Sequence, residues 1–310
     1  MSTQSNAIPG SPLESHLVAP AVIPASRLMY WSVRRELCEY RSIYIAPLAV
    51  AALFLVGFLI STIRLPGKMR AALALSPTQL QGSIGQPYDL AALLLMGTTF
   101  LVGIFYCLDA LYGERRDRSI LFWKSLPVSD LTTVLSKASI PLVVLPVLTF
   151  AITVATQLLM LLMSTAVLVG SGLSVTPLKQ LPLFQMSLGL LYHLVIVHSL
   201  YYAPIFAWLL LVSAWARRAP FLWAGLPLLA IGVVEKIAFN TTHFAAMLGA
   251  RMSGGPEAPP YPMPADLAMH SMTHLGAVYF LSSSGLWIGL IVAAAFLAAA
   301  VRLRRDQGPI

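Results

Sequence analysis

The sequence contains few charged residues and only two cysteines. Asp, Glu, Lys and Arg make up 10% of the 310 residues, whereas a soluble domain has about 25%. Hydrophobic residues make up 58%. This balance excludes an ordinary soluble protein and predicts an all-α polytopic membrane protein. Cys38 and Cys107 fall on or near the side predicted below to be cytoplasmic, so a structural disulfide is not expected.

The sequence also lacks the phosphate-binding loop of ATP-hydrolysing proteins. Gly67-Lys68 is followed by Met69 rather than Ser or Thr, and Thr62 stands where the first glycine of the motif would be. We therefore expect that the chain is not an enzyme by itself and binds no cofactor.

The first 41 residues divide into two parts. Residues 1–25 contain no Lys or Arg and no long apolar run, so they lack the features of a signal peptide, and we predict a disordered cytoplasmic tail. Residues 26–41 have helical periodicity, which predicts an amphipathic helix at the inner membrane interface, in contact with lipid phosphates. Arg35 and Glu39 are expected to face away from its apolar stripe. The stripe consists of Tyr30, Val33, Leu37 and Tyr40. The alternative is a plain basic flank of the first span.

Six apolar runs are long enough to cross a bilayer. They cover residues 43–60, 90–108, 140–168, 186–215, 221–238 and 285–301. We assign them to one six-span domain, residues 42–310. Of the Lys and Arg residues outside these runs, fourteen flank one side and five the other. The positive-inside rule therefore predicts cytoplasmic termini in a multi-pass protein of a cell membrane, with a bacterial inner membrane as the expected location. Membrane anchoring accounts for the net charge of +8, so no nucleic-acid partner is expected.

The loop between the second and third spans, residues 109–137, carries five basic and four acidic residues. Charge of this density is costly in hydrocarbon, so the loop is predicted to be aqueous and cytoplasmic. Within it, residues 120–123 form an apolar cluster, and Ser129 is predicted to cap a new helix. Exposed apolar groups on such a loop indicate a protein partner.

The acidic residue at the end of the second span, followed by ERRDRSILFWKSLPVSD, resembles the loop between spans two and three of ABC-2-type exporter permeases. In that family the loop forms a coupling helix that docks on a separate ATPase subunit. The residues assigned to ATPase coupling are Glu114, Arg115, Arg116, Asp117, Arg118, Leu121, Phe122 and Trp123. The alternative is an ordinary charged loop that obeys the positive-inside rule.

The resemblance implies several partners. ATP and Mg would be bound by two copies of the ATPase subunit, and six spans imply a second permease copy or a related permease. The helix at 26–41 would correspond to the connecting helix of the family. By the same resemblance the second and fifth spans line the substrate path. The candidate path residues are Phe100, Tyr106, Leu228, Glu235 and Lys236. The alternative for the last two is pairing with one another or reaching the outer interface.

The loop after the fifth span, residues 240–284, is the largest outer loop. Its segment 254–266 is turn-rich and hardly helical. Residues 275–281 are apolar but too short to span, which indicates a re-entrant or interfacial segment before the sixth span. His270 and His274 are weak candidates for a metal-binding pair, and no metal site is assigned.

These observations predict the transmembrane subunit of an ATP-driven ABC exporter, which couples to its ATPase through residues 109–137. The alternative is a stand-alone secondary carrier or a membrane assembly scaffold without an ATPase. A carrier is expected to have interrupted helices and buried coupling charges near the membrane midplane. Apart from Glu235 and Lys236, the predicted spans contain no such charges.

Overall fold

The computed structural model describes residues 24–72, 77–126, 128–179, 181–252, 281–306 and 308. Within these ranges every regular element is a helix, and six helical segments are long and apolar enough to cross a membrane. The prediction of an all-α, multi-pass membrane protein is confirmed at this level. The elements are α1 (Ala25–Glu39), α2 (Ser42–Thr62), α3 (Leu65–Ala72), α4 (Pro77–Ala110), α5 (Tyr112–Arg116), α6 (Ile120–Ser125), α7 (Asp130–Ser139), η1 (Ile140–Val144), α8 (Leu145–Gly170), α9 (Thr176–Lys179), α10 (Leu183–Tyr192), η2 (His193–Tyr201), α11 (Ala203–Trp215), α12 (Pro220–Phe239), α13 (His243–Met252) and α16 (Ser284–Asp306).

Two of the predicted spans are not uniform α-helices. The third begins with the π-helical turn η1, which lies where Pro141 and Pro146 remove backbone donors. The fourth contains the π-helix η2 and then breaks at Tyr202, just before Pro204 at the start of α11. An apolar run in the sequence does not reveal such breaks, because π-helical and α-helical turns bury the same kinds of side chain.

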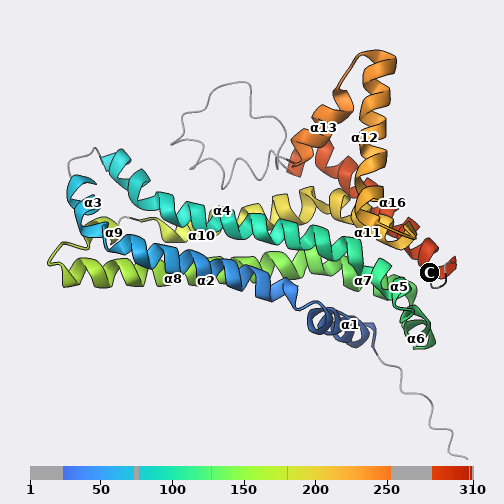
Figure 1. Ribbon diagram of the computed structural model, residues 1–310, viewed down its shortest axis with the longest axis horizontal. Coiled ribbons are helices and arrows are strands. Elements are labelled where there is room, and N and C mark those ends of the chain that lie inside the picture. The colour runs from blue at the N-terminus through green and yellow to red at the C-terminus, as the bar shows by residue number, and fades with distance from the viewer. Residues whose placement is uncertain are drawn as a thin grey trace, which may run out of the picture.

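The predicted cytoplasmic segments meet at one end of the molecule. Figure 1 shows α2, α4 and α8 running along a long bundle, with α10 and α11 beside them. At one end of this bundle lie α1, α5, α6 and the carboxyl end of α16, and at the other end lie α3 and α9. We call the first of these the charged end. It gathers the basic segments that the charge count assigns to one side, while the sidedness in a membrane stays a prediction.

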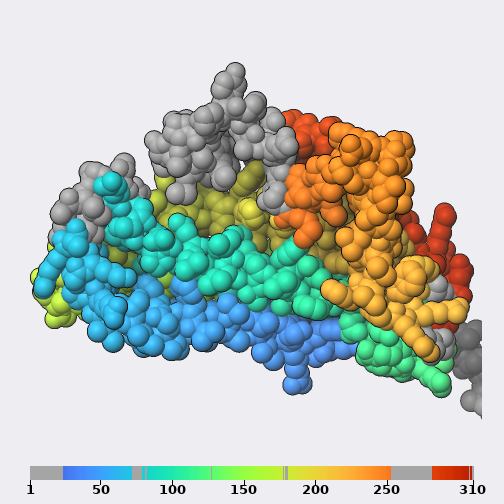
Figure 2. Space-filling model, turned by 45° about the horizontal axis from the view of Figure 1, so that its top comes forward, coloured from blue at the N-terminus to red at the C-terminus, as the bar shows by residue number. Residues whose placement is uncertain are grey.

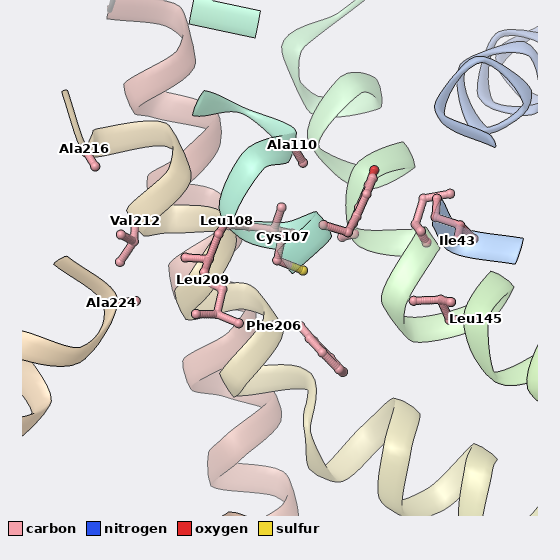
Figure 3. Packing of buried hydrophobic residues seen from close by; sticks show 14 residues of the cluster. Ile43, Cys107, Leu108, Ala110, Leu145, Phe206, Leu209, Val212, Ala216 and Ala224 are labelled. Carbon is pink, nitrogen blue, oxygen red and sulfur yellow. The ribbon is translucent and has the colours of Figure 1, made fainter. Parts of the chain in front are cut away.

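The main apolar core lies next to the charged end and draws on several helices (Figure 3). Phe206 of α11 and Leu145 of α8 approach Gly103 of α4, where an added Cβ would lie 3.0 Å from the Phe206 ring. Glycine at this position therefore allows α4 and α11 to pack closely, as small residues commonly do between membrane helices.

Helices α12 and α13 form an arm that stands out from the long bundle (orange in Figures 1 and 2). Asn240, in the left-handed conformation at φ 51°, ends α12 and lets the chain turn back into α13. The sequence reading did not anticipate α13 in this loop.

Several predictions fall outside the described residues. They concern most of the amino-terminal tail, the turn-rich segment 254–266, His270 and His274, and all but the last residue of the segment 275–281.

Candidate functional site

Helix α1 occupies nearly the range predicted for the interfacial helix. Three residues of the predicted stripe, Val33, Leu37 and Tyr40, pack against the main core, whereas Tyr30 is 61% exposed. The sequence reading missed Glu36, which is fully buried. Its signal in the sequence is its place next to Leu37, on the edge of the apolar stripe.

Glu36 binds a cation and a phenol inside the protein. Lys137 Nζ donates to both carboxylate oxygens, at 3.0 and 3.1 Å, and the Tyr106 hydroxyl donates to Oε2 at 2.8 Å. Arg35 also pairs with Glu36. The expectation that Arg35 faces away from the apolar stripe is wrong, because its guanidinium turns inward to the two buried carboxylates.

Glu114 is the second buried carboxylate. Its Oε1 lies 3.1 Å from Lys137 Nζ and 3.1 Å from an Arg35 nitrogen, and its Oε2 pairs with Arg304. Arg304 Nε also donates to Asp130 at 3.0 Å. Glu114 is therefore not an exposed charge of the loop, because these cations neutralise it inside the protein.

We call these six side chains the buried ion network: Arg35, Glu36, Glu114, Asp130, Lys137 and Arg304. They comprise three cations and three anions and come from α1, α5, α7 and α16. Buried charges are tolerated only when paired and hydrogen-bonded. The network therefore holds four elements in one arrangement, and the loss of one member leaves a charge buried without its partner.

The pKa values outside the spans reflect this arrangement. Burial by itself would raise the pKa of Glu36, but the positive charges of Lys137 and Arg35 outweigh burial and hold the pKa below its usual value. Burial raises the pKa of the Tyr40 hydroxyl, and the neighbouring carboxylates of Asp109 and Glu36 raise it further. Tyr40 therefore stays protonated and donates to Asp109 at 3.1 Å.

Helix α5 is fixed to the end of α11. The Ser213 hydroxyl oxygen accepts hydrogen bonds from the backbone N–H groups of Leu111 and Tyr112, at 3.0 and 2.8 Å, and so caps the start of α5. The buried Arg115 guanidinium donates to the carbonyls of Ala214 and Ala216. Arg115 is thus placed inside the protein, in contact with the end of a helix.

Helix α6 presents the apolar surface of the loop. Leu121 and Phe122 are each 59% exposed, whereas Trp123 is half-buried under the Arg35 guanidinium, 4.0 Å from its ring centre. The Lys124 ammonium donates to the Arg305 carbonyl at 3.2 Å, which ties α6 to the end of α16. Arg116, Asp117 and Arg118, which directly precede α6, are exposed charges.

The predicted cap of the following helix is confirmed. The Ser129 hydroxyl oxygen accepts a hydrogen bond from the Thr132 backbone N–H at 3.1 Å, and α7 begins at the next residue, Asp130. This cap starts the helix that carries Asp130 and Lys137 into the buried ion network.

The five candidate path residues have different surroundings. Phe100 packs against His198, Tyr202 and Phe206. Tyr106 is buried and donates to Glu36 of the network, and Leu228 is half-buried on α12. Phe100 and Tyr106 lie on α4, whereas Leu228, Glu235 and Lys236 lie on α12.

Glu235 and Lys236 also differ from one another. The Glu235 carboxylate accepts hydrogen bonds from the Thr241 hydroxyl and from the backbone N–H groups of His243 and Phe244, at 2.8, 2.7 and 2.9 Å. It therefore caps the start of α13. Lys236 is exposed on α12.

In the part of the chain that the structure describes, no three His, Cys, Asp or Glu side chains are grouped to hold a metal ion. No family model, curated protein or solved structure shows a significant match to the chain. The described part of the fold contains six helices long and apolar enough to cross a membrane, which indicates a multi-pass membrane protein.

Proposed function

We propose that the chain is the transmembrane subunit of an ATP-driven exporter, similar to ABC-2-type permeases, and that its partner ATPase docks on α6. The observation that carries this proposal is the position of Leu121 and Phe122. They are large apolar groups exposed on a short helix at the charged end. Exposed apolar groups of this kind are typical of interaction surfaces, and aromatic side chains commonly dominate binding energy at interfaces.

The buried ion network supplies a route from α6 to the spans. Glu114, four residues before the loop turn at Arg118, pairs with Lys137 of α7 and with Arg304 of α16. Helix α7 continues through η1 into α8. A force on α6 therefore reaches the third and sixth spans through paired charges rather than through a flexible loop, and α1 moves with them through Arg35 and Glu36. Transport is then a rigid-body tilt of spans that share one rigid end.

The complete exporter contains a second permease copy or a related permease and two ATPase subunits, which bind ATP and Mg. The charged end faces the cytoplasm, where ATP is available, with both termini on that side of a bacterial inner membrane. The apolar faces of α12 fit lipid or another permease, and the transported molecule passes between the two permeases.

The test is to isolate the tagged, unmodified chain from membranes of its source cells and to label the sample with a photoreactive azido-ATP. We expect a separate polypeptide, present in an amount similar to this chain, to take the label, and this chain to stay unlabelled. A preparation that transports without any labelled polypeptide would favour the secondary carrier.

A further inference from the structure

A hollow of about 440 Å³ lies where α2 gives way to α3. Figure 1 shows this junction at the end of the bundle opposite the charged end. The hollow is lined by Gly57, Ile60, Ser61, Ile63, Arg64 and Lys68. Its size lies within the range of about 300–1,000 Å³ that is usual for small-molecule sites.

The lining changes character along the helix axis. Gly57, Ile60 and Arg64 follow one another at helical spacings on one face. The Lys68 N–H donates to the Arg64 carbonyl at 3.0 Å, so Lys68 continues this face past the junction into α3. The face is therefore apolar within the span and cationic at its end.

Gly57 keeps the apolar part of the hollow open. A Cβ placed on Gly57 would meet no atom within 4 Å, so the space beside it is empty of protein. Ile60 and Ile63 are 63% and 79% exposed, and they border this space with hydrocarbon side chains.

Among the described residues, no carboxylate pairs with the cationic part of the hollow. Arg64 and Lys68 are both exposed, and neither takes part in the ion pairs found among the described residues. Both lie on the side that the charge count predicts to be external. Basic residues are disfavoured on that side, so the convergence of Arg64 and Lys68 on one hollow calls for an anionic ligand.

We propose that this hollow binds one molecule of an anionic glycerophospholipid from the leaflet next to α3. Its phosphate contacts Arg64 and Lys68, and the start of an acyl chain lies along Ile60 and the open space at Gly57. Ser61 supplies no donor to the phosphate, because its hydroxyl donates to the Phe58 carbonyl at 2.8 Å. The two cationic side chains thus favour a negatively charged headgroup, and the apolar surface at Gly57 and Ile60 favours a lipid over a free anion. The proposal does not depend on the exporter function, because it concerns binding alone.

The experiment measures binding of an acyl-labelled fluorescent phosphatidylglycerol to the purified chain in neutral detergent, with phosphatidylcholine carrying the same label as comparator. We expect phosphatidylglycerol to bind more tightly. The double variant Arg64→Gln with Lys68→Gln is expected to lose roughly tenfold or more of this affinity, because two charged donors are removed. Arg70→Gln is the matched control, since Arg70 is exposed and does not line the hollow. It should retain the preference.

A second variant tests the apolar part of the site. Gly57→Leu fills the open space without changing charge and should weaken binding of both labelled lipids, while its melting temperature shows that the protein remains folded. It also keeps the proposal testable if the double variant fails to fold. Three results would overturn the proposal: equal loss in Arg70→Gln and in the double variant, no effect of Gly57→Leu, or displacement of the bound lipid by millimolar inorganic phosphate.

Discussion

The charged end and the α12–α13 arm solve the same problem, a carboxylate close to an apolar span, in opposite ways. At the charged end Glu114 is buried among three cations from three other elements. In the arm Glu235 instead caps the helix that follows it. The first arrangement joins distant parts of the chain, whereas the second joins two neighbouring helices.

Burial follows the same division. In the most apolar stretch of α12 only 6% of residues are buried, against 44% in the most apolar stretch of the segment that runs from α7 to α8. The charged end is therefore expected to move as one unit with the spans attached to it, whereas the apolar faces of the arm need lipid or another protein to cover them. The contrast shows that charged residues of a loop between two spans, such as Glu114, can be buried inside the protein.

The largest effect is expected at Lys137, which contacts both buried carboxylates. Lys137→Ala should lower the free energy of unfolding by about 3–5 kcal/mol, because it leaves two buried charges without this partner. Lys236→Ala, at an exposed lysine of the arm, should change it by no more than about 0.5 kcal/mol. Equilibrium unfolding of both variants in detergent measures the two losses of stability. Equal losses would contradict the contrast between the two regions.

Glu36→Gln is expected to lower the free energy of unfolding by less than Lys137→Ala does, and by an amount that depends on pH. Because the pKa of Glu36 is lower in the folded chain than its usual value of 4.5, the ionised group stabilises the fold above that pH, and this contribution is lost as the pH falls through the folded pKa. Glu36→Gln should therefore cost about 1.5–3 kcal/mol at pH 7. The difference in the free energy of unfolding between the parent and Glu36→Gln should become smaller below about pH 4.5.

Glu39→Gln is the control for this measurement, one turn from Glu36 on the same helix. Burial raises the pKa of Glu39 and outweighs the opposing positive charge of Lys137, so its ionised form does not stabilise the fold. The variant should be as stable as the parent at pH 7 or slightly more stable. A gap for Glu36→Gln that stays constant from pH 7 to pH 3 would contradict the account of the network.

The smallest and most local effect is expected at Glu235. Glu235→Ala removes the acceptor of the first N–H groups of α13, so hydrogen exchange should accelerate in residues 243–252 and stay unchanged at the charged end. Lys236→Ala should leave exchange in α13 unaltered. Faster exchange that spreads to α5 and α7 would show that the two regions are not separate.

The sequence predicts the spans well because each is a long apolar run, and apolar length is what a bilayer requires. It also predicts the Ser129 cap, since capping depends on residues next to one another in the chain. The breaks at η1 and η2 escape such a reading, because packing against other helices decides where a span departs from α-helical geometry.

The buried ion network is invisible to local patterns for a different reason. Glu36 and Lys137 are 101 positions apart and Glu114 and Arg304 are 190 apart, so only the fold brings them together. A single sequence shows these residues as ordinary flanking charges. The apolar cluster of α6 was recognised, since Leu121 and Phe122 stand out from a charged loop without any knowledge of the fold.

The claim that α6 docks the ATPase is tested most directly by purifying the complex with a tagged Phe122→Ala chain or a tagged Phe184→Ala chain. ATP hydrolysis and azido-ATP labelling are then measured for both preparations. Both phenylalanines are exposed, but Phe184 lies in the first turn of α10, away from the charged end. The account predicts that Phe122→Ala keeps the fold, shown by an unchanged melting curve, yet loses the labelled subunit and its ATP hydrolysis, while Phe184→Ala retains both. Full hydrolysis and an intact complex in Phe122→Ala would contradict the assignment of α6 as the docking helix.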